Sequence, residues 1–149
     1  MKAITELNEI QVSYSNTSDK NAVKTSEQAN DACKQAYALL NAQISLKEHF
    51  IVLFLNRASR VIGFYHLSSG GIAGTVADLR LAFSIGLKCL ASSMILCHNH
   101  PSGNTKPSQA DIDLTRKFSQ AGEIMEIMVV DHIVLAEDGY YSFADDGLL

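Results

Sequence analysis

The pattern of hydrophobic and polar positions along the chain alternates between strand-like and helix-like periods. Apolar or alternating stretches predict strands over residues 50–55, 60–67, 93–100, 124–130, 132–136 and 140–143. Helical spacing of apolar residues predicts helices over residues 26–42, 76–90 and 108–121, the first capped by Ser26 and the last ended by Gly122. Interleaved strands and helices predict an α/β fold with a mixed sheet flanked by helices, since the first two strands form a hairpin.

Further expectations concern the N-terminal segment, a glycine-rich stretch and the buried face of one helix. Residues 1–25 are rich in polar residues and predict an N-terminal extension, with an edge strand over 10–14, before a domain over 26–149. The Gly- and Ser-rich stretch 68–74 is expected to be a loop that borders a substrate groove. In the helix over 76–90, the stripe expected to face the core consists of Leu79, Phe83, Leu87 and Leu90.

One segment concentrates polar chemistry directly after a buried strand. His98 and His100 are two residues apart on the strand, so both side chains point to the same face. A Pro-Gly turn follows, and Ser108 then begins a helix with Asp111 in its first turn. Folding the helix back would bring a carboxylate to two imidazoles, which is the ligand set of a catalytic zinc site with an open fourth position.

Each part of this segment also has a simpler interpretation. Two histidines on one strand face can be packed and hydrogen bonded without a metal. Ser108-x-x-Asp111 fits a capping box at the start of an amphipathic helix. The two roles are compatible, and the joint spacing favours the metal site. Two His and one carboxylate also suit iron.

A zinc-activated water needs a general base, and the best candidate is Glu48, just before the apolar run at 50–55. The alternative is that Glu48 only marks the solvent boundary of a buried strand. Asp131 and His132 form a second polar pair. They are interpreted as a sheet-edge or turn pair, or alternatively as outer hydrogen-bond partners of the metal site.

The combination of these residues resembles a known family. His98-x-His100 followed by Ser108-x-x-Asp111, with an upstream Glu, resembles the JAMM motif of the MPN-domain metalloproteases, and the string 98–103 resembles its RadC-like branch. The resemblance implies the MPN fold, a cytidine-deaminase-like three-layer sandwich. It also implies zinc ligation by His98, His100 and Asp111, acid/base catalysis by Glu48, and an oxyanion donor in Ser108.

Members of the RadC-like branch were named for a DNA-repair role and carry an N-terminal helix-hairpin-helix region. This chain of 149 residues is too short to include that region, which weakens the expectation of a DNA-linked role. The formal charge of −4, without a basic run, also argues against a dedicated nucleic-acid surface. The cysteines, Cys33, Cys89 and Cys97, are odd in number and lack the Pro-Cys-x-x-Cys pair of a zinc deaminase, so they predict core positions.

These observations predict a zinc-dependent hydrolase, a metallopeptidase or isopeptidase that uses one Zn²⁺ ion and acts on a peptide or protein substrate. The alternative is a DNA-repair-associated or protein-binding MPN scaffold without proteolytic activity. No stretch is apolar and long enough to span a bilayer, and the N-terminus lacks a signal-peptide core, so the expected location is the cytoplasm. The predicted N-terminal edge strand would allow two chains to pair as a homodimer.

Overall fold

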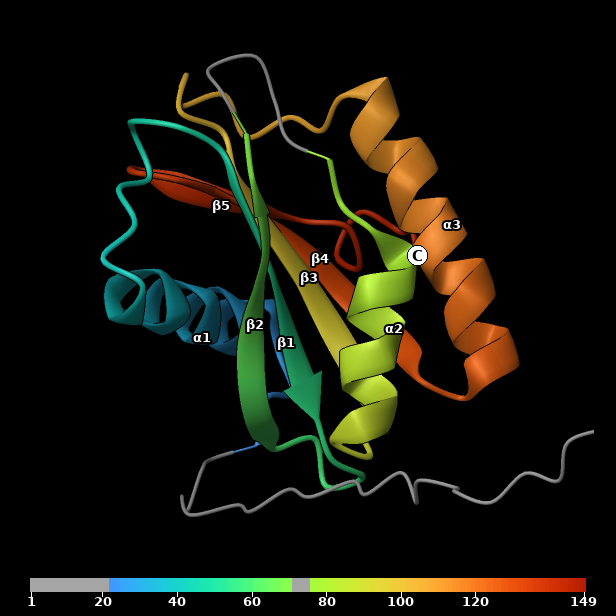
Figure 1. Ribbon diagram of the computed structural model, residues 1–149. Helices are drawn as coiled ribbons and strands as arrows, with labels where there is room; N and C mark the ends of the chain where they lie inside the picture. Colours follow the sequence, from blue (N-terminus) through green and yellow to red (C-terminus); the bar gives the residue numbers. More distant parts are fainter. Residues whose placement is uncertain (1–21, 71–75) are drawn as a thin grey trace, which may run out of the picture.

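A computed structural model describes residues 22–70 and 76–149, and its centre is a mixed sheet (Figure 1). The five strands lie in the order β2-β1-β3-β4-β5. Their bounds are β1 (His49–Leu55), β2 (Val61–Ser69), β3 (Ser93–Asn99), β4 (Met128–Ala136) and β5 (Gly139–Ser142). β3 and β4 pair in parallel, and the other neighbouring strands pair antiparallel. The predicted α/β class with a mixed sheet is confirmed.

Helices cover both faces of the sheet, so the domain has three layers (Figure 1). Helix α1 (Ser26–Leu39) packs on one face, whereas α2 (Leu79–Lys88) and α3 (Gln109–Met125) pack on the other. Every residue of β1 is buried, because this strand lies inside the sheet with helices above and below. A continuous apolar run is the pattern expected for such a strand.

The alternation of side chains along the central strands separates two cores. Phe50, Val52 and Leu96 belong to the cluster beneath α2 and α3, while Ile51 and Cys97 belong to the cluster beneath α1. Residues with the parity of Leu96 therefore point toward α2 and α3. This parity decides on which side of the sheet the end of β3 presents its polar side chains.

The structure corrects several predicted boundaries. Residues 128–136 form one strand, because the chain continues through Asp131 and His132 without a turn, and both side chains are buried. Helix α1 is capped by Thr25 rather than Ser26 and ends at Leu39. Ser68 and Ser69 belong to β2 rather than to a loop.

The two helices on the site face also differ from prediction. Helix α2 is capped by Asp78 and ends at Lys88, so Leu90 lies beyond it with φ of 56° and is 78% exposed; Leu87 is 46% exposed. The prediction that Leu87 and Leu90 face the core was wrong. Gly122 does not end α3, which continues to Met125. A Cβ at Gly122 would lie 2.5 Å from the Ile127 carbonyl oxygen, so glycine allows the chain to return closely past the helix.

Other expectations lie partly outside the described residues. The predicted edge strand at 10–14 and residues 71–74 of the predicted loop are among the residues not described, and the domain boundary at 25/26 stays a prediction. Cys33 and Cys97 are buried and Cys89 is half-buried, all as free thiols. Among the helices at 22–70 and 76–149, none combines the length and apolar character needed to cross a membrane.

Candidate metal centre

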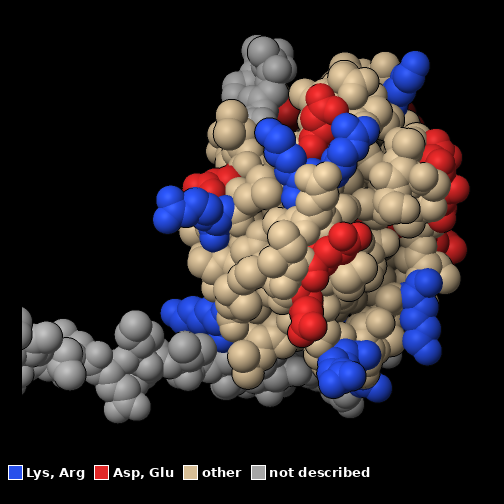
Figure 2. Space-filling model, turned by 90° about the vertical axis from the view of Figure 1, so that its right-hand side faces the viewer, with Lys and Arg blue, Asp and Glu red and all other residues tan. Residues whose placement is uncertain are grey.

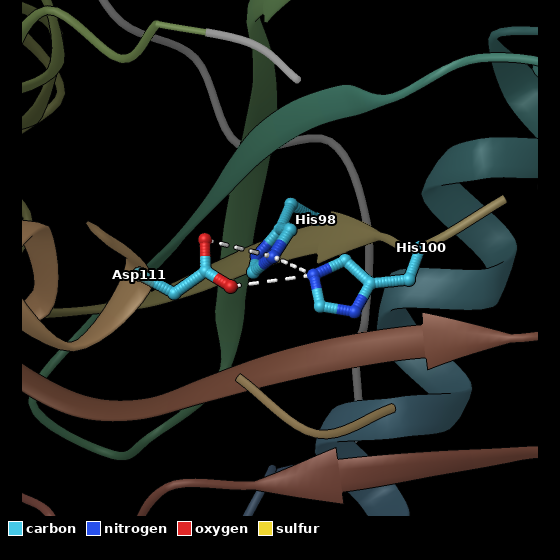
Figure 3. A group of neighbouring side chains, drawn as sticks. All are labelled: His98, His100 and Asp111. Atoms are coloured by element: carbon cyan, nitrogen blue, oxygen red, sulfur yellow. Dashed lines mark hydrogen bonds and ion pairs between the residues drawn. The ribbon is translucent and has the colours of Figure 1, made fainter. Parts of the chain in front are cut away.

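Three side chains converge beside the sheet, one from β3, one from the residue after it and one from the start of α3 (Figure 3). His98 is the penultimate residue of β3 and has the parity that faces α3. His100 follows directly after the strand, and Gly103, with φ of 85°, lies in the turn that leads toward α3. Asp111 lies in the first turn of α3, whose N-terminus points back at the strand end. The predicted meeting of two imidazoles and a carboxylate therefore occurs.

The distances among the three side chains match the edges of a metal coordination site. His98 Nε2 lies 3.0 Å from His100 Nε2 and 3.4 Å from Asp111 Oδ1. His100 Nε2 lies 3.3 Å from Asp111 Oδ2. Tetrahedral ligands at about 2.0–2.2 Å from Zn²⁺ are separated from each other by about 3.3–3.6 Å. One divalent cation could therefore contact all three residues with small adjustments.

The hydrogen bonding of His100 leaves a lone pair for that cation. His100 Nδ1 lies 2.6 Å from the carbonyl oxygen of Asn104. Because a carbonyl oxygen can only accept, we assign the hydrogen of His100 to Nδ1. In the neutral ring, Nε2 then carries a lone pair that faces His98 and Asp111. In the metal-free protein, the hydrogen bond to Asp111 raises the pKa of His100.

Asp111 takes part in the helix cap and in the candidate site at the same time. Its carboxylate accepts the Ser108 backbone N–H at 2.8 Å, and Ser108 Oγ accepts the Asp111 N–H at 3.1 Å, so the predicted capping box is present. Burial alone would raise the pKa of Asp111, but contacts with His100 and His98 hold it well below its usual range. The carboxyl group is therefore an ionised ligand candidate that the helix cap holds in place.

Strand pairing explains how Glu48, far upstream, reaches the same site. In the antiparallel pair of β1 and β3, Phe50 is opposite His98. If it continued for two more residues, this register would place Glu48 opposite His100 and on the same face of the sheet. Glu48 and His100 line one pocket of about 550 Å³, together with Lys106 and the turn after β3. The structure thus places Glu48 on the wall of a pocket that it shares with one candidate ligand, His100.

Asn99 holds the segment that carries Glu48, from the opposite face of the sheet. Its Oδ1 accepts the His49 N–H at 2.7 Å and the Tyr37 hydroxyl at 2.8 Å. Its Nδ2 donates to the carbonyl oxygens of Ile44 and Lys47, at 2.7 and 2.9 Å. The residue between the two histidines therefore fixes the approach to β1. Strand alternation by itself indicates only that the Asn99 side chain points away from the two histidines.

His132 and Thr115 form an outer layer behind His98. His132 is fully buried in the middle of β4, and its Nε2 lies 2.7 Å from His98 Nδ1. On its other side, His132 Nδ1 lies 2.6 Å from Thr115 Oγ1. The interpretation of Asp131-His132 as a sheet-edge or turn pair was wrong, and the alternative of an outer partner holds for His132. Asp131 instead binds Ser142 Oγ and the Ala144 N–H.

Thr115 was not anticipated as part of this layer. Its only signal in the sequence is its position one helical turn after Asp111, on the same side of α3. Burial and the neighbouring His98 lower the pKa of His132 well below its usual value, so the ring is neutral. The layer therefore adds no charge next to the candidate ligands.

The fold and the site together define a class of protein. It is a mixed α/β domain with a candidate metal site, formed by a His-x-His segment and an Asp, at the end of a central strand. Comparison with known families agrees, because residues 23–148 match the RadC-like JAB domain. This chain belongs to the RadC-like JAB domain family. The resemblance found in the sequence is thereby confirmed.

Three relatives of this chain are UPF0758 proteins. It is 48% identical over 117 residues to a UPF0758 protein of Flavobacterium johnsoniae, covering 77% of this chain and 51% of that protein. The identity is 43% over 104 residues to a UPF0758 protein of Porphyromonas gingivalis, with coverage of 69% and 46%. For a UPF0758 protein of Syntrophomonas wolfei it is 38% over 127 residues, with coverage of 85% and 54%. The chain thus spans about half the length of these curated relatives.

Proposed function

We propose that this domain is a zinc-dependent hydrolase that cleaves a peptide or isopeptide bond in a peptide or protein substrate. The observation that carries the proposal is the convergence of His98, His100 and Asp111 within 3.0–3.4 Å, beside a pocket lined by Glu48. A bound zinc ion would lower the pKa of a water to about 7 and polarise the scissile carbonyl. Membership of the RadC-like JAB domain family supports this assignment.

The residues of the chain would divide the remaining work. Glu48 would accept a proton from the attacking water and deliver it to the departing amine, because it lies on the wall of the same pocket as His100. The oxygen of Ser108 accepts the Asp111 N–H, so its own hydrogen remains available to donate to the developing oxyanion. Asp111 and the neutral imidazoles would supply one negative charge to balance part of the ion.

The two alternative functions, a protein-binding scaffold and a DNA-repair role, predict different experimental results. A protein-binding scaffold would not hydrolyse a substrate, and a DNA-repair role predicts salt-sensitive DNA binding. Figure 2 shows the face formed by α2 and α3, where Lys and Arg side chains are interspersed with Asp and Glu. A mixed surface of this kind does not favour the binding of nucleic acid at that face. We therefore prefer the hydrolase to the DNA-repair role.

The test is hydrolysis of a mixed library of peptides and lysine isopeptides. Cleavage is measured as the release of new amino groups. We expect release by the zinc-loaded protein, loss with a chelator, and recovery on adding Zn²⁺. Glu48→Gln should retain zinc but lose turnover by about 100- to 10,000-fold, the usual contribution of a general acid–base.

Glu123→Gln is the matched control, because Glu123 is an exposed carboxylate on α3. It should leave turnover unchanged. Full turnover by Glu48→Gln would refute the base assignment, and chelator-resistant turnover would refute the metal mechanism. Loading the same protein with Fe²⁺ in place of Zn²⁺ decides which ion supports the reaction.

A further inference from the structure

We propose that Thr115 and His132 act as a positioning relay that holds His98 in the tautomer required for metal binding, and that this relay sets the metal affinity of the centre. The inference rests on the metal site of the proposed function. It adds residues from α3 and β4 that do not contact the metal position. Neither residue is a catalytic residue, because each acts only through His98.

The contacts form a closed ring between two candidate ligands. Thr115 Oγ1 lies 2.6 Å from the backbone carbonyl oxygen of Asp111 and 2.6 Å from His132 Nδ1. His132 Nε2 lies 2.7 Å from His98 Nδ1, and His98 Nε2 lies 3.4 Å from the Asp111 carboxylate. The ring therefore connects β3, β4 and α3 around the site.

The carbonyl of Asp111 fixes the direction of every proton in the ring. This oxygen can only accept, so at 2.6 Å the single hydroxyl hydrogen of Thr115 points toward it. Thr115 Oγ1 must then accept from His132 Nδ1–H. In a neutral His132 ring, Nε2 carries no hydrogen and accepts from His98 Nδ1–H. His98 Nε2 is thus left with a lone pair directed at the metal position.

The surroundings of His132 hold its ring in the orientation that this order requires. Its ring stacks on Phe143 at a centroid distance of 4.6 Å and meets Phe50 edge-on at 5.6 Å. His132 and Thr115 are 0% and 1% exposed, so water cannot easily replace a lost partner. Removing either partner would allow His98 to place its hydrogen on Nε2, in the path of the ion.

The experiment measures both the tautomer and the zinc affinity of the full chain. In the zinc-free protein with ¹⁵N-labelled histidine, NMR should show His98 protonated at Nδ1. Thr115→Val should populate the Nε2-protonated form and weaken Zn²⁺ binding, measured by competition with a chromophoric chelator, by about 10- to 100-fold. Thr115→Ser keeps the hydroxyl and should restore both the tautomer and the affinity.

His132→Phe keeps the stacking on Phe143 but removes the acceptor, and we expect a loss at least as large as for Thr115→Val. Ser142→Ala is the matched control, because it removes a buried hydroxyl bound to Asp131 at 2.7 Å without touching the relay. It should lower the unfolding free energy but leave zinc affinity unchanged. If His132→Phe fails to fold, the Thr115 pair still decides the question.

Two failures can be told apart. A wild-type chain that binds no zinc would overturn the metal centre and the proposed function with it. A wild-type chain that binds zinc, while Thr115→Val binds it equally well or Ser142→Ala weakens it equally, would overturn the relay alone.

Discussion

At the scale of single residues, the centre uses side chains that serve the fold and the site together. Asp111 caps α3 through Ser108 and directs both carboxylate oxygens toward the imidazoles. Asn99 supports the segment before β1 from the face opposite to the histidines. A substitution at either position therefore changes stability and site geometry at once, so a functional test needs a stability control.

His49 predicts how the stability of the fold depends on pH. Burial, followed by the nearby charges of His66 and Lys47, lowers the pKa of His49 below its usual value of about 6.5. Between the folded and unfolded pKa values, the unfolded chain binds more protons. The contribution of neutral, buried His49 to stability is therefore fully present above pH 6.5. It is lost as the pH falls from there through the lower pKa of the folded state.

The measurement is urea unfolding of the zinc-free protein at pH 7.5 and 5.5. His49→Gln should lose less unfolding free energy on acidification than the wild type, because the other titrating groups are common to both. Equal losses in the two proteins would show that His49 does not contribute to acid sensitivity.

At the scale of elements, the site depends on the pairing of β1 with β3 and on the return of α3. Asn99→Ala tests the first of these, because it removes the acceptor of the buried His49 N–H and the donor to two loop carbonyls. We expect a loss of at least about 2 kcal/mol in unfolding free energy, since each buried polar group left without a partner costs roughly 1–3 kcal/mol.

Asn56→Ala is the comparison, because the Asn56 side chain bonds the Ala58 and Arg60 N–H groups in an exposed turn. Its cost should be smaller, as water can replace these bonds. Urea denaturation measures both variants. A cost for Asn99→Ala no larger than that for Asn56→Ala would mean that Asn99 does not hold the segment before β1.

At the scale of the whole molecule, a bound ion should stabilise the fold, because its ligands come from β3 and α3 in different layers. Free zinc at about 100 times its dissociation constant should add about 2.7 kcal/mol to the unfolding free energy. Thermal unfolding with and without Zn²⁺ measures this as an upward shift of Tm. His98→Ala should show no such shift, and an equal shift in that variant would indicate binding elsewhere.

Much of this architecture could be predicted from local pattern. Strand periodicity puts His98 and His100 on one face, and the spacing of Ser108 and Asp111 gives the capping box, because both features depend on residues close in sequence. The strand and helix order followed from the same periodicities. The predicted end of α3 at Gly122 was wrong, because Gly122 stays inside the helix and gives room for the returning chain, while the helix ends at Glu126 in a left-handed conformation.

The sequence by itself determined the candidate ligands, their shared face and the α/β class, since these follow from periodicity and short-range spacing. Only the tertiary structure decided that Glu48 shares a pocket with His100, that Asn99 holds its segment, and that His132 contacts His98. The physical reason is strand register. A shift of one residue between β1 and β3, or between β3 and β4, would reverse which side chains meet, and local pattern does not specify that alignment.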